Sequence, residues 1–341
     1  MNVDDELQAT IARLVQPGKG ILAADESLPT IGKRFEAVGV ESTPENRQTY
    51  RTMLFKTPGI EAFISGVILF EETLAQRDAS GTPLPEVLAR VGVVPGIKVD
   101  QGKVPLAHAP GDEVTQGLDG LAARLKTYRG MGARFAKWRE VYRIGPRNPS
   151  PLGIEANAEV LARYAAVCQE EALVPIVEPE VLIDGDHTME RCEEVIDAVL
   201  HAVYHALHRH RVVLEHTLLK PSMVLPGKER KPKATPDEVA LATLRVLKRS
   251  VPAAVPGINF LSGGQGPEEA TANLNAINAR DPSAPWALSF SYGRALQDHA
   301  MKAWAGNPGD AAIAQRAFYR RARLNGFARR GTYEEQMERE D

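Results

Sequence analysis

The sequence predicts an α/β fold, namely a single (β/α)8 TIM barrel with an additional N-terminal helix and a short charged C-terminal tail. Two observations support this prediction: eight short β-rich runs recur along the 341 residues, and longer helical patterns lie between them. Strands that alternate with helices form parallel sheets with right-handed crossovers, and eight such strands close into a barrel. The main alternative is an open doubly wound sheet. It is disfavoured because no early strand is followed by a G-x-G-x-x-G turn.

The predicted elements follow one another in regular alternation. The eight strands are predicted at Gly20–Ala24, Phe63–Leu69, Gly96–Val99, Arg134–Trp138, Val174–Val177, Glu215–Leu219, Gly257–Leu261 and Trp286–Phe290. The clearest helices are predicted at Leu118–Met131, Asn157–Ala172, Met189–His208, Pro236–Arg249 and Pro267–Ala279. Thr235 and Pro236 illustrate a strong helix start, because they offer an N-cap hydroxyl and a proline in the first turn.

The two ends of the chain lie outside this repeat. Residues 1–17 are predicted to contain a helix, because Leu7, Ile11 and Leu14 recur at helical spacing. The last residues, about 329–341, are highly charged, and we expect them to be mobile. No long Ser/Gly-rich linker interrupts the sequence, so residues 1–341 are predicted to form one domain.

Composition narrows the class of protein and its partners. The formal net charge is −3, which predicts no general attraction to nucleic acid or to an anionic membrane. The longest apolar stretches, such as Phe63–Phe70, are too short to span a bilayer, and the N-terminus lacks the pattern of a signal peptide. Only Cys168 and Cys192 are present, which favours a reducing compartment. We therefore expect a cytoplasmic protein.

Charged residues stand at or just beyond the ends of five predicted strands. They are Asp25, Lys98 with Asp100, Lys137 with Arg139, Glu178 with Glu180, and Lys220. Each alone has a simple alternative explanation, a surface charge or a structural ion pair. Catalytic groups of barrels sit at the carboxyl ends of the strands, so five such positions together predict an active site there.

The lysine that closes the sixth predicted strand, Lys220, is the candidate nucleophile. Partial burial and neighbouring cations disfavour an ammonium group and release the amine, and we expect Lys98, Lys137 and Lys220 to share one pocket. A lysine that forms a Schiff base also needs a proton shuttle and a base. Glu178 is the best-placed shuttle, and Asp25 fits the base.

Two glycine-containing turns predict an anion site. Ser262-Gly263-Gly264 follows the seventh predicted strand, and Tyr292-Gly293-Arg294 follows the eighth. Barrels often bind phosphate on these two loops, where glycines admit backbone N–H groups and an arginine binds the anion with two hydrogen bonds.

The histidines give only a weak signal for a metal. His201 and His205 have the i, i+4 spacing of metal ligands, but their helix leads into the sixth strand and ends at the opposite side of the barrel. The sequence has neither an H-E-x-x-H motif nor cysteine-rich zinc spacing. We expect no metal and no other cofactor.

Nine sequence blocks, in order, carry a family resemblance. They are Leu22–Ser27, Gly66–Phe70, Pro95–Asp100, Gln116–Leu121, Phe135–Arg139, Ile176–Glu180, Leu218–Pro221, Phe260–Gln265 and Phe290–Leu296. In these blocks the chain resembles the class I fructose-1,6-bisphosphate aldolases over nearly its whole length. The resemblance implies reversible cleavage of fructose 1,6-bisphosphate to dihydroxyacetone phosphate and glyceraldehyde 3-phosphate, without a metal, by a homotetramer in glycolysis or gluconeogenesis.

The resemblance also implies a role for each matching residue. Lys220 is implied to form the Schiff base, Glu178 to act as its acid and base with help from Lys137, and Asp25 to take the C4 hydroxyl proton. Ser262, Gly263, Gly293 and Arg294 are implied to bind the C1 phosphate, Ser27, Thr30, Lys98 and Arg139 to serve the C6-phosphate side, and Glu180, Gly264 and Tyr292 to complete the substrate-binding set.

Some alternatives stay open at this point. They are a Schiff-base barrel enzyme for another carbonyl substrate, a non-catalytic barrel, and a metal-dependent aldolase; sedoheptulose 1,7-bisphosphate is a further candidate substrate. The last aromatic residue is Tyr333, whereas well-known members of the family end in a tyrosine that assists proton exchange. We therefore expect protonation of the enamine at C3 to be slower in this protein, or to be done by another group such as Glu178 or the bound phosphate.

Overall fold

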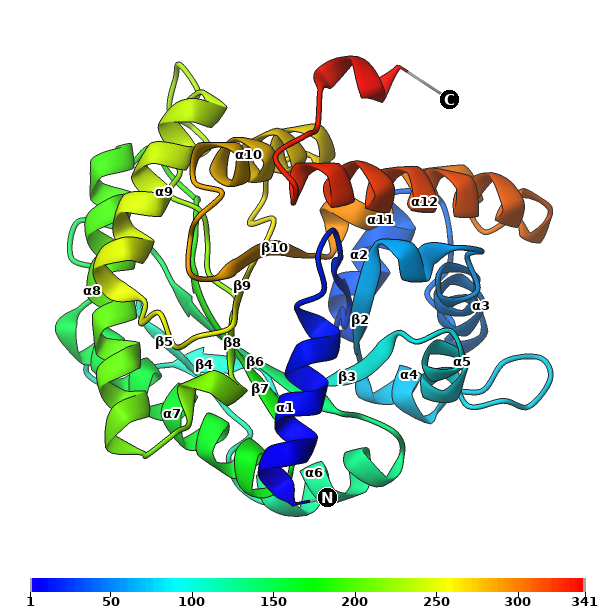
Figure 1. The fold of residues 1–341 in the computed structure, drawn as a ribbon, viewed down its shortest axis with the longest axis horizontal. Coiled ribbons are helices and arrows are strands. Elements are labelled where there is room, and N and C mark those ends of the chain that lie inside the picture. The colour runs from blue at the N-terminus through cyan, green and yellow to red at the C-terminus, as the bar shows by residue number, and fades with distance from the viewer. Residues whose placement is uncertain (1, 340–341) are drawn as a thin grey trace.

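The computed structural model describes residues 2–339 and forms a closed barrel of eight parallel strands (Figure 1). The strands are β1 (Gly20–Ala24), β2 (Ile64–Leu69), β3 (Val94–Lys98), β6 (Phe135–Tyr142), β7 (Val174–Val181), β8 (Leu218–Leu219), β9 (Gly257–Phe260) and β10 (Ala287–Tyr292). Each strand pairs with the next barrel strand along the chain, and β10 closes on β1. The predicted (β/α)8 barrel is confirmed.

Helices surround the barrel in Figure 1. They are α1 (Val3–Leu14), α2 (Leu28–Glu36), α3 (Pro44–Phe55), α4 (Glu71–Ala75), α5 (Leu84–Arg90), α6 (Leu121–Gly130), α7 (Pro151–Glu170), α8 (Met189–Arg209), α9 (Pro236–Ser250), α10 (Pro267–Arg280), α11 (Arg294–Trp304) and α12 (Ala311–Ala328). Short 3₁₀ turns lie at Ile60–Ala62, Leu214–His216, Pro308–Asp310 and Glu335–Glu338. The predicted start of α9 is confirmed, because Thr235 and Glu238 cap each other's backbone N–H groups.

Helix α1 closes the amino-terminal end of the barrel. Its buried residues Leu7, Ile11 and Leu14 pack in one apolar cluster with residues at the starts of the strands, among them Ile21 and Val174. Figure 1 shows α1 lying across the barrel. The helical spacing seen in the sequence thus corresponds to an apolar face that burial removes from water.

An antiparallel hairpin, β4 (Lys103–Pro105) with β5 (Glu113–Thr115), is inserted between β3 and α6. Lys103 lies opposite Thr115 in this pair. Helix α7 holds the hairpin from outside, because Asn157 Nδ2 donates to the Glu113 carbonyl oxygen at 2.9 Å. The hairpin was not predicted from the sequence.

Three strand boundaries differ from the prediction by three residues or more, and the others agree to within two residues. β6 and β7 continue to Tyr142 and Val181, four residues beyond their predicted ends at Trp138 and Val177. The charged residues read as strand ends are therefore inside strands, where ion pairs with neighbouring strands compensate their burial. The predicted strand Glu215–Leu219 is reduced to Leu218–Leu219, because its first residues form a 3₁₀ turn.

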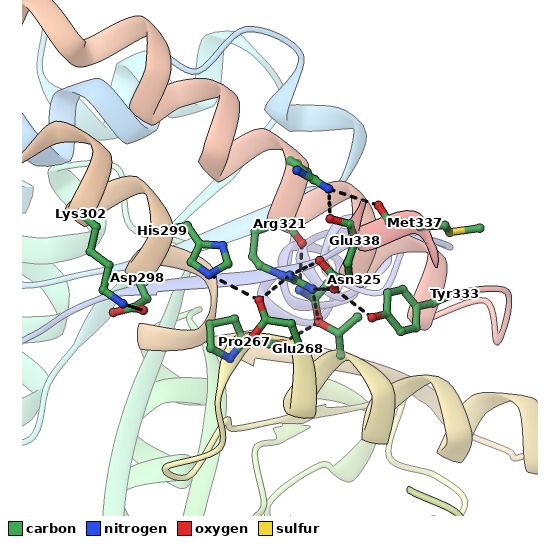
Figure 2. A network of polar contacts seen from close by, with 12 residues as sticks. Pro267, Glu268, Asp298, His299, Lys302, Arg321, Asn325, Tyr333, Met337 and Glu338 are labelled. Carbon is green, nitrogen blue, oxygen red and sulfur yellow. Dashed lines mark hydrogen bonds and ion pairs between the residues drawn. The ribbon is translucent and has the colours of Figure 1, made fainter. Parts of the chain in front are cut away.

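The segment after α12 is packed against that helix as far as Glu338. Arg321 donates to both carboxylate oxygens of Glu338, at 2.6 and 2.8 Å, and the Tyr333 hydroxyl donates to Glu338 Oε1 at 2.9 Å. Figure 2 shows these side chains directed toward one another. Tyr333 is buried. Where a mobile tail was expected, residues 329–338 are thus held by contacts, and residues 340–341 lie outside the described residues.

The sequence also led to expectations about the two cysteines and about membrane-spanning helices. Cys168 and Cys192 are both buried and unbridged, as expected of packing residues. In residues 2–339, each helix falls short of the length and apolar character that a membrane crossing requires.

Candidate active site

A cavity of about 1320 Å³ opens at the carboxyl ends of the barrel strands. Its lining includes fourteen of the fifteen predicted site residues, namely Asp25, Ser27, Thr30, Lys98, Lys137, Arg139, Glu178, Glu180, Lys220, Ser262, Gly263, Gly264, Gly293 and Arg294. These residues come from seven separate places in the sequence, and the barrel brings them together around one cavity.

Tyr292 is the predicted substrate-binding residue that the fold turns away. Its hydroxyl donates to the Ala270 carbonyl oxygen of α10 at 2.9 Å, and its ring packs beside Phe290. Successive side chains of a strand point to opposite faces, so Ser291 faces the cavity and Tyr292 faces the helices. The side chain of Tyr292 is therefore directed away from the cavity that the other predicted site residues line.

Four buried groups form a continuous chain of opposite charges at the base of the cavity. Lys137 Nζ lies 2.7 Å from Asp25 Oδ2 and 3.0 Å from Glu178 Oε2. Lys220 Nζ lies 3.0 Å from Glu178 Oε1. The order Asp25–Lys137–Glu178–Lys220 places a carboxylate beside each amine.

Local structure explains how these side chains are aimed inward. Lys137 and Glu178 occupy inward-facing positions of the paired strands β6 and β7. Lys220 directly follows the buried Leu218–Leu219, and its backbone N–H donates to the Val177 carbonyl oxygen at 2.8 Å, which extends the pairing with β7. The position of the lysine is therefore fixed by the sheet itself.

Burial and neighbouring charges shift the pKa values of these buried groups in opposite directions. Burial raises the pKa of Asp25, but the cations of Lys137 and Lys220 outweigh it and hold that pKa well below its ordinary value. The same balance lowers the pKa of Glu178. Burial disfavours the ammonium form of Lys137, but Asp25 and Glu178 outweigh burial and raise its pKa. Both carboxylates and Lys137 are thus held ionised.

The expected repulsion among three lysines needs a correction. Lys98, Lys137 and Lys220 do line one cavity, but carboxylates separate them, and Lys98 Nζ lies 3.0 Å from Asp100 Oδ1. Attraction to these carboxylates exceeds repulsion between the amines at Lys137, whose pKa rises instead of falling. The sequence pattern could not show this because it does not give distances between strands.

The two predicted phosphate loops face the same cavity. Gly263 and Gly264 follow Ser262 with φ of +51° and +89°, a backbone conformation that favours glycine. Gly293 caps α11, and Arg294 is the first residue of that helix. Backbone N–H groups at a helix start and an adjacent guanidinium group attract an anion.

The predicted C6-phosphate side lies around the start of α2 and the inner face of β6. The hydroxyls of Ser27 and Thr30 lie 3.0 Å apart. Arg139 and Glu180, both expected to contact substrate, form an ion pair with each other. Glu180 therefore holds the guanidinium group of Arg139 in the cavity.

Several residues of the lining were missed in the sequence. Lys33 and Arg34 of α2 also face the cavity, and Arg34 donates to Glu26 Oε1 at 2.6 Å. Helical spacing could have predicted this position, because Lys33 and Arg34 follow Thr30 by three and four residues and therefore lie on the same face of α2. Lys302 of α11 lines the cavity too, about two helical turns beyond Arg294, and it does not follow a predicted strand.

Within the part of the chain that the structure describes, no three His, Cys, Asp or Glu side chains are grouped to hold a metal ion. His201 and His205 are exposed on α8. Neither histidine lines the cavity.

Comparison with known proteins agrees with this arrangement. The family model of class-I fructose-bisphosphate aldolase matches residues 6–341. The cytoplasmic isozyme of fructose-bisphosphate aldolase from Spinacia oleracea is 56% identical over 97% of this chain and 92% of its own length. Fructose-bisphosphate aldolase C from Homo sapiens is 54% identical over 96% of this chain and 91% of its own length.

A solved structure extends the similarity to the fold. Fructose-bisphosphate aldolase from Plasmodium falciparum, in a ternary co-crystal with TRAP and a small-molecule inhibitor, superposes with a TM-score of 0.96 at 50% identity. The match covers 97% of this chain and 96% of that one. The chain belongs to the class I fructose-bisphosphate aldolase family.

Proposed function

We propose that Lys220 attacks the C2 carbonyl of fructose 1,6-bisphosphate and forms the Schiff base of the aldolase reaction. The supporting observation is the buried chain Asp25–Lys137–Glu178–Lys220, which lies at the base of the cavity. An amine must lose its proton before it attacks, and Glu178 is the carboxylate in contact with Lys220.

Glu178 then acts as the proton shuttle of the carbinolamine. It takes the proton that Lys220 releases and returns a proton to the departing C2 hydroxyl, so that water leaves and the iminium forms. Lys137, held as an ammonium between two carboxylates, stabilises Glu178 in its ionised form between these transfers.

Asp25 is the proposed base for carbon–carbon cleavage. It accepts the C4 hydroxyl proton while the C3–C4 bond breaks, and the electron pair of that bond moves into the iminium to give an enamine. Glyceraldehyde 3-phosphate leaves first. Protonation at C3 and addition of water then release dihydroxyacetone phosphate and free Lys220. The iminium serves as the electron sink, so the proposed reaction needs no metal and no other cofactor.

Two phosphate sites complete the proposal. Ser262, Gly263, Gly264, Gly293 and Arg294 bind the C1 phosphate, and Ser27, Thr30, Lys98 and Arg139 serve the other end, with Glu180 orienting Arg139. Basic residues outnumber acidic ones in the cavity lining, nine to seven, although the whole chain has a net charge of −3. This local excess favours a substrate with two phosphates, and sedoheptulose 1,7-bisphosphate is the proposed second substrate.

The cellular setting is part of the same proposal. We place the enzyme in glycolysis and gluconeogenesis in the cytoplasm, in line with the cytoplasmic isozyme from Spinacia oleracea. The proposed assembly is a homotetramer, and light scattering at working concentration would measure it. A stable monomer would contradict that assignment without affecting the chemistry.

Reduction with borohydride tests the central claim. In the presence of fructose 1,6-bisphosphate, the iminium should be reduced to a stable secondary amine on the peptide that contains Lys220, as read by mass mapping. The peptide that contains Lys137 is an internal control, because this lysine is equally buried and touches the same Glu178. Substrate-dependent labelling at Lys137, or at any residue other than Lys220, would contradict the proposal.

A second arm addresses the metal. Activity should be unchanged after prolonged incubation with EDTA, whereas complete loss that added divalent metal restores would refute a metal-free reaction. Sedoheptulose 1,7-bisphosphate should produce the same label on Lys220.

A further inference from the structure

Glu140 is a buried carboxyl group that the proposed chemistry does not use. It lies on β6 next to Arg139, but on the opposite face of the strand, and it is fully buried. Both of its hydrogen-bond donors are neutral: Trp138 Nε1 donates to Oε1 at 2.8 Å, and the Thr115 backbone N–H donates to Oε2 at 3.0 Å. Burying an acidic group is unfavourable unless its hydrogen bonds compensate for the loss of water.

The contact with Thr115 joins the β4–β5 hairpin to the barrel. Thr115 makes a second bond to β6, because its Oγ1 donates to the Arg139 carbonyl oxygen at 2.8 Å. Two adjacent residues of β6, Arg139 and Glu140, are thus bound by one residue of the hairpin. Since Thr115 lies opposite Lys103, this link also fixes β4.

The hairpin forms one wall of the active-site cavity. Gln101, Gly102, Lys103 and Thr115 all line the cavity beside Arg139. The other observed anchor of β5 is the bond from Asn157 to the Glu113 carbonyl oxygen, on the side of α7. Glu140 is therefore a buried anchor that acts at the residue of β5 facing the cavity.

We propose that Glu140 is a positioning residue for the second phosphate: it holds the β4–β5 hairpin against β6 and so fixes Arg139 and Lys103 around the end of the substrate remote from Lys220. This inference rests on the proposed function, which assigns Arg139 to the C6-phosphate side. Glu140 contacts no substrate in this proposal and acts through Thr115 and Arg139.

Paired substrates separate positioning from general stability. Fructose 1-phosphate has the same reacting carbons as fructose 1,6-bisphosphate but lacks the second phosphate. For Glu140→Gln, kcat/KM should fall about tenfold with the bisphosphate, mainly through KM, and by less than about twofold with the monophosphate. The glutamine keeps the shape but turns an amide N–H₂ group toward one of the two donors, so one bond is lost.

Asp78→Asn provides a matched control. Asp78 is also a buried carboxylate that accepts two backbone N–H bonds, from Ser80 and Thr82, both at 2.9 Å, but it lies outside the cavity lining. This variant weakens a comparable anchor at a distance from the substrate. It should leave the ratio of kcat/KM for the two substrates unchanged.

Thr115→Val is the second test variant. If Glu140→Gln does not fold, Thr115→Val tests whether the link between the hairpin and β6 affects binding of the second phosphate. It removes the bond from Oγ1 to the Arg139 carbonyl oxygen while keeping the side-chain shape, so it should change the same ratio in the same direction. Equal losses on both substrates, or an unchanged ratio in every folded variant, would overturn the positioning role. Failure of the native enzyme to label Lys220 would instead overturn the proposed function.

Discussion

The two ends of the barrel differ in the kind of side chain that they bury. At the amino-terminal end, Leu7, Ile11 and Leu14 of α1 fill the opening with apolar side chains. At the carboxyl end, the interior contains the charged chain Asp25–Lys137–Glu178–Lys220 above the same apolar layer. One end thus contributes burial of apolar surface, and the other holds ionised groups that burial alone would disfavour.

This difference indicates where stability and chemistry reside. Replacing buried ion pairs by apolar groups is often neutral or stabilising, whereas removing apolar side chains from a core is reliably destabilising. Substitutions at the carboxyl end should therefore change turnover far more than folding. Substitutions at the amino-terminal end should do the reverse.

The largest effect is expected for Lys220→Met. Methionine keeps an unbranched side chain of similar length but has no amine, so turnover of fructose 1,6-bisphosphate should fall by about 10⁴-fold or more. Loss of the Lys220 amine leaves Glu178 paired with Lys137 alone, so stability should fall, but by less than the roughly 5.4 kcal/mol to which a 10⁴-fold loss of turnover corresponds. Steady-state assays and chemical unfolding on the same preparation measure both quantities. Residual turnover within about tenfold of native would show that catalysis does not depend on the amine of Lys220.

The next effect is expected for Glu178→Gln. The amide fits the same space but cannot shuttle protons, so kcat should fall by about 10²- to 10⁴-fold. Borohydride trapping on Lys220 should become slower rather than be abolished, because the nucleophile remains. Rapid trapping at the native rate, followed by impaired release, would move the role of Glu178 to a later step.

A charged residue that directly follows an apolar run is the most informative pattern in this sequence. Asp25 and Lys220 fit this pattern, and both lie where the barrel was expected to place them. The lengths of β6 and β7 were not predictable in the same way. Lys137 and Glu178 look like strand ends until their partners on other strands are known.

The direction of Tyr292 and the burial of Glu140 could not be predicted from the sequence, and both depend on the alternation of side chains along a strand. The direction of Tyr292 depends on the exact register of β10, and a single position separates the cavity face from the helix face. Glu140 reads as one more charge in a charged stretch. Its burial depends on Thr115, which lies 25 residues earlier in a hairpin that the sequence did not reveal.

At the amino-terminal end, Leu14→Ala should affect stability alone. Leu14 is almost completely buried against the barrel, so the free energy of unfolding should fall by about 2–5 kcal/mol. Turnover should stay within about twofold of native, because the cavity lies at the opposite end. Leu152→Ala is the matched control, since Leu152 is 49% exposed and should change stability by less than about 0.5 kcal/mol. A loss of turnover larger than the loss of stability at Leu14 would show that the two ends are coupled.

The smallest expected effect concerns the pH dependence of stability, and it comes from the outer face of β6. Burial raises the pKa of Glu140 to about 7, although bonds from Trp138 and Thr115 oppose this shift. A carboxyl group with a raised pKa binds more protons in the folded than in the unfolded chain, whose value is near 4.5. Its contribution to stability is therefore present at low pH and is lost as pH rises from about 5 to about 7.

This loss amounts to about 2–3 kcal/mol, on the scale of about 1.4 kcal/mol per pH unit. Glutamine at position 140 does not titrate, so the difference in unfolding free energy between the native chain and Glu140→Gln should shift across pH 5–7 in favour of the variant. Asp25 and Glu178, whose pKa values are lowered, titrate below this window and remain in both proteins, so they cancel in the difference. A difference that stays flat from pH 5 to pH 8 would mean that Glu140 is ionised throughout. In that case the outer face of β6 would hold a buried charge without an ion pair. Burial alone would then not explain why one end of the barrel is apolar and the other is charged.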